Sequence, residues 1–335
     1  MRWLKDVRKV LLNLQILRAF AALSVVLFHT IGTAASHGFD TRWISYLEGW
    51  GASGVDVFFV ISGFVMLYTQ LDNKRSVKDF LVSRAIRIIP IYWLLTIIIV
   101  VVYLVTPFAF RELVVTPDWL LASLGFMSKA VIGKHPIVYQ GWTLEWEMLF
   151  YLVFGISLLF RSWAATLAVT TVVLLAVALA ASNFILMEFV AGLLIALLFK
   201  KYGFKRFGRS SLIVGSLLLL ISINSDVGAL IESRVILWGI PSVLIVYGAV
   251  ATMQLNSSIG KLLGDASYSI YLIQMLSIPI FYKALSIIGL NVNSDIMAII
   301  CLVATAIGGT IMHLTVEKPI TRVLKNVFLS NSHQR

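Results

Sequence analysis

The sequence predicts an all-α membrane protein, a polytopic bundle of about ten transmembrane helices with both termini in the cytoplasm. Of its 335 residues, 59% are hydrophobic and only 13% are charged, whereas about a quarter of the residues are charged in a typical soluble domain. Apolar segments continue along the whole chain, which does not fit a signal peptide followed by a soluble body.

Ten apolar segments have the length and composition of membrane-spanning helices. A further stretch, 119–132, is amphipathic and too short to cross a bilayer, so we expect an interfacial or re-entrant piece there. The predicted spans lie near residues 12–33, 54–70, 86–106, 141–160, 163–181, 184–199, 210–223, 234–252, 267–288 and 295–314.

The basic residues give the orientation. With the N-terminus inside, twenty of the 27 Lys and Arg residues fall in cytoplasmic segments, six fall outside and Arg18 lies within the membrane. Ten spans with both termini inside therefore satisfy the positive-inside rule. Topology thus explains the net charge of +11 without nucleic-acid binding. We expect one transmembrane domain, 1–318, followed by a short basic cytoplasmic tail, 319–335.

The first span carries two ionisable residues, Arg18 and His29, in an otherwise apolar stretch. Eleven residues bring a helix to within about 20° of its starting face and about 16 Å further along its axis. Ionisable groups in a bilayer are costly and usually face a polar interior, so both are candidate functional residues. The alternative is a snorkelling Arg near one end and a His at the far interface.

In the second span, Asp56 lies about one turn inside an apolar run. It would share the depth of His29 and could orient and charge-tune the imidazole, or it could merely cap the helix start. The small residues Gly51, Gly54 and Gly63 would let neighbouring backbones approach closely.

The third span begins with Arg84 and Arg87, three residues apart and so on one helix face at the cytoplasmic end. Two guanidinium groups so placed suit phosphate recognition by planar, bidentate donors. Anchoring by the positive-inside rule explains the pair equally well on pattern alone.

The fourth span contains Glu145 and Glu147, which are about 200° apart on a helix and so cannot both face one pocket. We expect Glu147 at the depth of the first-span histidine. The neighbouring Trp142, Trp146 and Tyr151 fit an interfacial aromatic belt.

Later polar residues are weaker signals. Glu188 lies within the sixth span and needs an internal partner. Glu317 and Lys318 close the last span, where we expect them to pair with each other. His313 could be a second base, although a satisfied core or interface histidine is the commoner case. The single cysteine, Cys301, lies in an apolar span and gives neither a disulfide nor a metal site.

Several catalytic patterns are absent from the sequence: the GxSxG elbow, the P-loop, HExxH and cysteine-based metal spacing. No histidine has an aspartate five residues later, so the HxxxxD arrangement is also missing. Catalysis would therefore need residues that the fold brings together from different spans. Because no metal-ligand spacing is present, we also expect no metal.

Six segments together resemble the integral-membrane acyltransferase-3 family, and look most similar to its exopolysaccharide O-acyltransferase branch. They occur in family order over nearly the whole chain. They are LRAFAALSVVLFH (17–29), GVDVFFVISGF (54–64), RAIRIIPIYW (84–93), WTLEWEMLFY (142–151), SYSIYLIQ (267–274) and VEKP (316–319).

The resemblance implies a ten-span core in the bacterial inner membrane that moves an acyl group, commonly acetyl, onto a sugar at the outer face. Two positions depart from the family pattern: Gln274 stands where a histidine is common, and Met148 replaces an acidic residue. The family's functional residues fall on Arg18, His29, Arg84, Arg87, Glu147 and Glu317.

We therefore expect acyl-CoA, with acetyl as the expected acyl group, to bind with its phosphates near the third-span arginines while Arg18 guides the thioester. His29, oriented by Asp56 or Glu147, would deprotonate a hydroxyl presented from outside, which attacks the thioester or an acyl-enzyme intermediate. The expected partners are a carbohydrate acceptor (a polysaccharide or lipid-linked oligosaccharide), the lipid bilayer and polysaccharide-synthesising machinery, without nucleic acid.

Two other classes of protein stay open. A transporter or flippase for a lipid-linked glycan could hold a pyrophosphate head group with the same basic residues, although no internal repeat supports one. The second open class is a non-catalytic partner of a polysaccharide synthase. His29 near carboxylates favours acyl transfer, because transport of an anion needs no general base.

Overall fold

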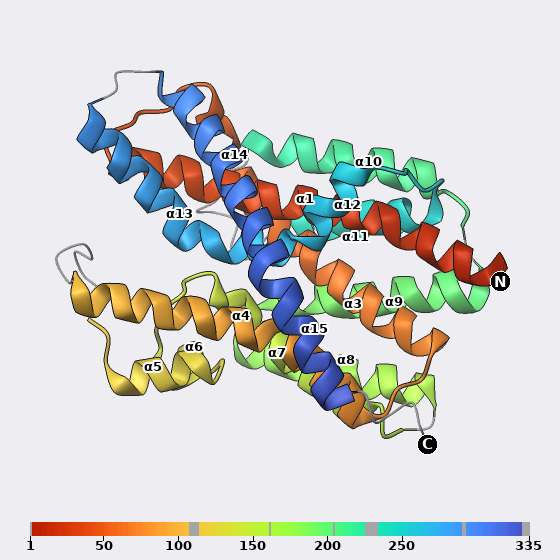
Figure 1. The fold of residues 1–335 in the computed structure, drawn as a ribbon. Helices are drawn as coiled ribbons and strands as arrows, with labels where there is room; N and C mark the ends of the chain where they lie inside the picture. Colours follow the sequence, from red (N-terminus) through yellow and green to blue (C-terminus); the bar gives the residue numbers. More distant parts are fainter. Residues whose placement is uncertain are drawn as a thin grey trace.

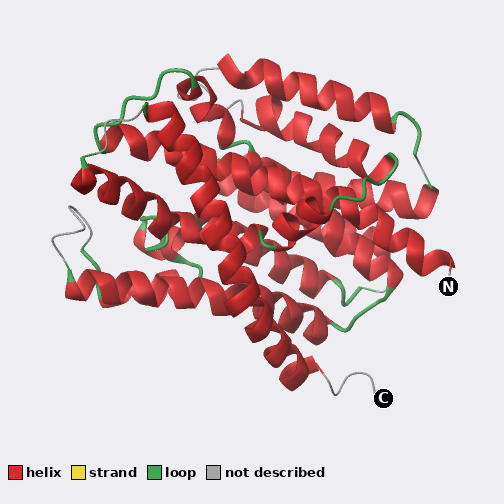
Figure 2. Cartoon of the chain, turned by 45° about the horizontal axis from the view of Figure 1, so that its top comes forward, coloured by secondary structure: helices red, strands yellow, loops and turns green. Residues whose placement is uncertain are grey.

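The computed structural model describes residues 2–106, 114–160, 162–203, 205–224, 234–289 and 293–329, with side chains from residue 12 onward. Within these residues the chain forms helices joined by turns and loops, without strands (Figure 2). The predicted all-α class is confirmed for this part of the chain.

A helix covers each of the ten predicted spans. Shorter helices lie between or after them: α2 Glu48–Gly51, α5 Pro117–Leu124, α6 Ser128–Ile132, α12 Ser258–Asp265 and α15 Lys318–Leu329. The helices that cover the predicted spans are α1 Arg2–Ser36, α3 Gly54–Asp72, α4 Val77–Val105, α7 Gly141–Ser157, α8 Trp163–Ala180, α9 Met187–Tyr202, α10 Gly208–Ile221, α11 Ile240–Ala251 with the π-helical turn Val235–Gly239 before it, α13 Ser267–Ile288 and α14 Ser294–Met312.

Six helical segments among the described residues are long and apolar enough to cross a membrane by themselves. They are the part of α1 from Leu12 to Ser36 and the segments that contain α3, α4, α8, α13 and α14. Helices α7 and α9 have 17 and 16 residues, about 25 Å at 1.5 Å per residue, which is shorter than the roughly 30 Å hydrocarbon core. The structure thus supports a multi-pass protein, while ten crossings and cytoplasmic termini stay predictions.

Helix α3 lies at the centre of the bundle (Figure 1). It is the most deeply buried of the six long segments, and it packs on α9 and α1. Helices α10 and α11 form one neighbouring pair and α13 and α14 another, while α4 contacts α7 and the C-terminal helix α15.

Glycines permit the closest helix contacts, as the sequence predicts. A Cβ atom on Gly63 would lie 2.0 Å from the carbonyl oxygen of Phe189 in α9, and one on Gly54 would lie 2.3 Å from that of Ala21 in α1. A Cβ on Gly51 would meet the carbonyl oxygen of Ser24 at 2.4 Å. No side chain fits at these crossings without moving backbone.

The amphipathic stretch between α4 and α7 forms the short helices α5 and α6, and hydrogen bonds hold it to the bundle. The Tyr92 hydroxyl donates to the carbonyl of Ser123 at 3.0 Å, and the Trp93 indole donates to that of Leu124 at 2.9 Å. Glu145 accepts the backbone N–H of Ser128 at 2.7 Å. One of the two fourth-span glutamates therefore has a structural role in this loop.

Candidate active site

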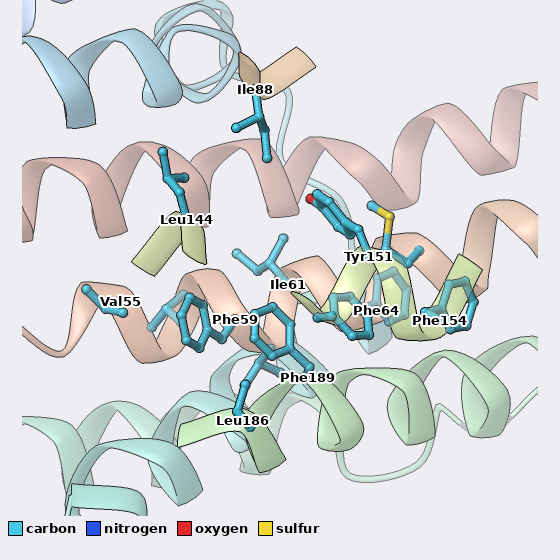
Figure 3. Packing of buried hydrophobic residues seen from close by; sticks show 14 of the residues in the cluster. Val55, Phe59, Ile61, Phe64, Ile88, Leu144, Tyr151, Phe154, Leu186 and Phe189 are labelled. Carbon is cyan, nitrogen blue, oxygen red and sulfur yellow. The ribbon is translucent and has the colours of Figure 1, made fainter. Parts of the chain in front are cut away.

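A cavity of about 90 Å³ lies between α1, α3, α4, α7 and α13. Its lining is mostly apolar and aromatic, and includes Phe58, Phe59, Tyr268 and Tyr271. On the α9 side, the Phe59 ring stacks on Phe189 with 4.3 Å between centroids (Figure 3).

Three charged residues line this cavity: Arg18 from α1, Arg87 from α4 and Glu147 from α7. The Arg18 guanidinium donates to the hydroxyl of Ser267 at 2.9 Å and to the side-chain oxygen of Gln15 at 3.2 Å. The charges of Arg87 and Glu147 are close enough to act on Arg18. The fold thus brings together three predicted residues that are far apart in the sequence.

Glu147 is held by hydroxyl groups rather than by a histidine. Its Oε1 atom accepts hydrogen bonds from Tyr151 and, at 3.0 Å, from Ser62. Tyr151 is only 3% exposed, so its assignment to an interfacial aromatic belt is wrong. The four-residue spacing between Glu147 and Tyr151 places them on one helix face, and this was the signal available in the sequence.

The two third-span arginines have different surroundings. Arg87 faces the cavity, whereas Arg84 lies over the rings of Phe80 and Tyr151, 6.0 and 5.9 Å from their centroids. Such cation–π contacts stabilise a guanidinium in a partly apolar site. Within the described residues, neither arginine nor Arg18 forms a direct ion pair with a carboxylate.

His29 lies toward the other end of α1 and is not part of the cavity lining. Its half-buried ring meets Tyr139 edge-on, with 6.2 Å between centroids, and packs against Phe28 at 4.9 Å. Tyr139 in turn contacts the ring of His135 at 4.7 Å. No described residue forms a hydrogen bond with the imidazole of His29, which leaves both ring nitrogens available.

Asp56 has a partner other than the expected one. Its fully buried carboxylate accepts from Nε and Nη2 of Arg234, at 3.1 and 2.6 Å. Glu188 is also buried beside this pair, close enough for the charges of Asp56 and Arg234 to act on it. We expected Asp56 or Glu147 to orient His29. In the structure both carboxylates instead form hydrogen bonds with other side chains.

The last span ends in a third polar group. Glu317 accepts from the hydroxyl of Ser269 at 2.6 Å and pairs with Nδ1 of His313 at 2.8 Å. The expected pairing of Glu317 with Lys318 is therefore wrong, because the i, i+4 spacing to His313 brings that side chain onto the same face. Gln274 is buried and donates to the carbonyl of Tyr271.

Sequence reasoning missed the roles of Arg234 and Tyr139. Arg234 reads as an ordinary basic residue at the start of a span, and Tyr139 lies in a loop without any motif. Both acquire their contacts through pairing of distant segments. Among the residues that the structure describes, no group of three or more His, Cys, Asp or Glu side chains could hold a metal ion.

These features define a multi-pass helical membrane protein with a charged cavity inside its bundle. The model of the acyltransferase-3 family, described as an acyltransferase domain, matches residues 11–314, and the chain therefore belongs to this family of acyltransferases. It is 37% identical over 300 residues to the exopolysaccharide production protein ExoZ of Rhizobium meliloti (strain 1021), covering 81% of this chain and 90% of that protein. No solved structure matches the chain.

Proposed function

We propose that this acyltransferase is an O-acyltransferase of the bacterial inner membrane. It would move an acyl group, expected to be acetyl, from cytoplasmic acyl-CoA to a hydroxyl of an extracytoplasmic polysaccharide or lipid-linked sugar. The similarity to an exopolysaccharide production protein supports a carbohydrate acceptor. One observation carries the proposal: α1 presents Arg18 to a charged cavity and, eleven residues further on, the His29 imidazole, which has no hydrogen-bond partner among the described residues.

The cavity suits the donor end of the reaction. An acyl-CoA combines an anionic nucleotide with an extended, less polar pantetheine arm that ends in the thioester. Arg18 and Arg87 supply positive charge that no carboxylate neutralises by direct pairing in the described chain, and the aromatic lining suits the arm. Arg84 would add a second cation at the same end of α4.

His29 is the proposed general base. Its neutral imidazole would take the proton of the acceptor hydroxyl as the oxygen attacks the thioester carbonyl. The carbon–sulfur bond then breaks and the thiolate of CoA takes up the proton, so atoms and charge balance. A positioned base of this kind contributes about 10²–10⁴-fold. Tyr139, in edge contact with the ring, would hold the imidazole in place.

The remaining site residues receive supporting roles. Glu147, on the cavity wall, would balance the charge of the two arginines there. Asp56 would act indirectly, because its ion pair with Arg234 fixes the N-terminal end of α3 to the segment before α11. Glu317, bonded to Ser269, would fix the start of α13, which also carries the Ser267 hydroxyl that binds Arg18.

Residues 1–318 would form the transmembrane domain and residues 319–335 the basic tail. The bilayer, the carbohydrate acceptor and the polysaccharide-synthesising machinery are the proposed partners. A flippase for a lipid-linked glycan is the alternative, since its pyrophosphate would also suit the arginines of the cavity.

Incubating purified protein with radiolabelled acetyl-CoA and acceptor-containing membranes separates the two functions. Acyl transfer predicts label in polysaccharide or lipid-linked sugar, with release of CoA. A flippase predicts movement of the unlabelled glycan across the membrane without any labelled product. Mass spectrometry of cell-surface glycans from cells with and without the gene would identify the acylated hydroxyl.

A further inference from the structure

Two hydroxyl groups meet at one end of the cavity. The side-chain oxygen of Thr143, near the start of α7, lies 2.8 Å from the hydroxyl of Tyr271 on α13. The Thr143 and Tyr271 oxygens also lie 3.0 and 3.2 Å from the carbonyl oxygen of Gln140. Both residues are buried and both line the cavity. This hydroxyl pair, Thr143 and Tyr271, is therefore placed to contact a molecule bound there.

The hydroxyl pair lies at the end of the cavity away from the arginines of α4. Along α7 the lining runs from Thr143 to Tyr151, which are about 12 Å apart on a helix. Arg84 lies over the ring of Tyr151, at the far end of this stretch. Figure 3 shows Leu144, the neighbour of Thr143, well separated from Tyr151. A donor with its phosphates at the arginines would thus extend its thioester toward the hydroxyl pair.

The same end of the cavity is connected to His29. Gln140, whose carbonyl oxygen contacts both hydroxyls, follows Tyr139 in the chain. The ring of Tyr139 meets the His29 imidazole edge-on, with 6.2 Å between centroids. The turn at residues 139–140 therefore links the hydroxyl pair to the proposed base.

The hydroxyl pair can direct one hydrogen at a ligand while the Gln140 carbonyl stays satisfied. Each hydroxyl carries one hydrogen, which rotates to suit its partners, so two hydrogens cannot fill all three contacts at once. When Thr143 donates to the Gln140 carbonyl, the Tyr271 hydrogen is free to point at a bound molecule. A donor held in advance where negative charge develops lowers a reaction barrier more than the same donor does in water.

We infer that the Tyr271 hydroxyl is the oxyanion donor of the acyl transfer, an inference that rests on the proposed function. As the acceptor oxygen bonds to the thioester carbon and its proton passes to His29, an electron pair moves onto the carbonyl oxygen. Tyr271 donates a hydrogen bond to that oxygen. The carbonyl then re-forms, the carbon–sulfur bond breaks, and the thiolate of CoA takes the proton from His29. Thr143 is a positioning residue, because it holds the Tyr271 hydroxyl and satisfies the competing Gln140 carbonyl.

The test is acetyl transfer by the purified full chain from radiolabelled acetyl-CoA to membranes of cells that lack the gene. Tyr271→Phe should lower the transfer rate about 10²-fold, as expected for loss of one oxyanion donor, with acetyl-CoA affinity and thermal unfolding temperature unchanged. Tyr282→Phe is the matched control on the same helix. It removes a buried hydroxyl that has no hydrogen-bond partner among the described residues and lies outside the cavity lining, so it should transfer at the wild-type rate.

Thr143 provides a second, independent variant. Thr143→Val should lower transfer about three- to tenfold, the loss of one neutral hydrogen bond, because Tyr271 would then donate to the Gln140 carbonyl instead of the substrate. Thr143→Ser keeps the hydroxyl and should restore most of the rate.

Three results would overturn the inference. Wild-type transfer by Tyr271→Phe would show that the hydroxyl is not needed. Equal losses in Tyr271→Phe and Tyr282→Phe would indicate a general effect of removing hydroxyls from α13. A loss of acetyl-CoA affinity or of thermal stability that accounts for the lost transfer would assign the hydroxyl to ground-state binding or to packing. With normal wild-type transfer, each of these results rejects the inference alone; absence of transfer by the wild type would reject the proposed function as well.

Discussion

Arg234 binds the carboxylate of Asp56 through two nitrogen atoms, with Nε 3.1 Å from Oδ1 and Nη2 2.6 Å from Oδ2. The same Nη2 atom donates to the carbonyl of Ala52 at 3.1 Å. This pair ties the segment before α11 to the N-terminal end of α3, across 178 positions of sequence. The ion pair therefore predicts a structural role for Asp56.

Asp56→Asn should destabilise the protein by about 3 kcal/mol, because breaking a buried ion pair leaves its other charge uncompensated. Thermal unfolding in detergent would measure the change, with the exposed Asp40→Asn as the control for the same chemical substitution. The double variant Asp56→Asn/Arg234→Gln should lose less than the sum of the single losses. Normal stability with abolished turnover would instead place Asp56 in the chemistry.

Gly63→Ala should destabilise the contact between α3 and α9, since the added Cβ would lie 2.0 Å from the Phe189 carbonyl oxygen. We expect a loss of about 1–3 kcal/mol, as for overpacking in a close-packed core. Gly308→Ala is the control, because its Cβ would meet nothing nearer than 4.0 Å. Similar unfolding temperatures for the two variants would contradict the packing described for α3.

Arg87→Gln should weaken acyl-CoA binding about tenfold, and Arg84→Gln by less. Arg87 lines the cavity, whereas Arg84 is held over the rings of Phe80 and Tyr151. A lost hydrogen bond to a charged group costs about 1.5–3 kcal/mol. Arg87→Lys should recover only part of the affinity, because lysine keeps the charge and loses the bidentate geometry.

Titration of the purified variants with acetyl-CoA would supply these affinities. Unchanged binding in both glutamine variants would remove the arginine pair from the donor site.

Tyr139→Ala should lower turnover about tenfold through loss of the ring that positions His29, since small displacements of a reacting group are costly. Tyr139→Phe keeps that ring and should restore nearly full turnover. Tyr46→Ala, which removes an exposed tyrosine from the segment between α1 and α2, should have no effect. If turnover were as low in Tyr139→Phe as in Tyr139→Ala, the hydroxyl of Tyr139 would be required and the proposed positioning role of its ring would be wrong.

The sequence predicts the helices well because each apolar run must satisfy its own backbone hydrogen bonds in lipid. The sequence also predicts that a neighbouring helix packs closely at Gly63, because small residues in membrane spans let two helix backbones approach. The number of crossings is harder, because α7 and α9 are shorter than an ordinary span and can be counted either way.

Side-chain partners were the weak part of the prediction. Hydropathy predicts the position of Asp56 along its span but not which helices surround it. Its pairing with Arg234 therefore could not be predicted from the sequence. Glu317 had two sequence neighbours able to pair with it, and helix geometry selected His313. Arg18 and Glu147 could each be singled out because each is a costly ionisable residue in an apolar context. The sequence analysis expected Glu147 beside His29, whereas the structure places it on the cavity wall with Arg18 and Arg87.

The most direct test of the central claim is acetyl transfer by His29→Ala and His29→Gln, assayed with radiolabelled acetyl-CoA and the glycan acceptor, together with acetyl-CoA affinity. We expect a loss of about 10²–10⁴-fold in transfer with expression and acetyl-CoA binding unchanged. Full transfer by His29→Ala would contradict it.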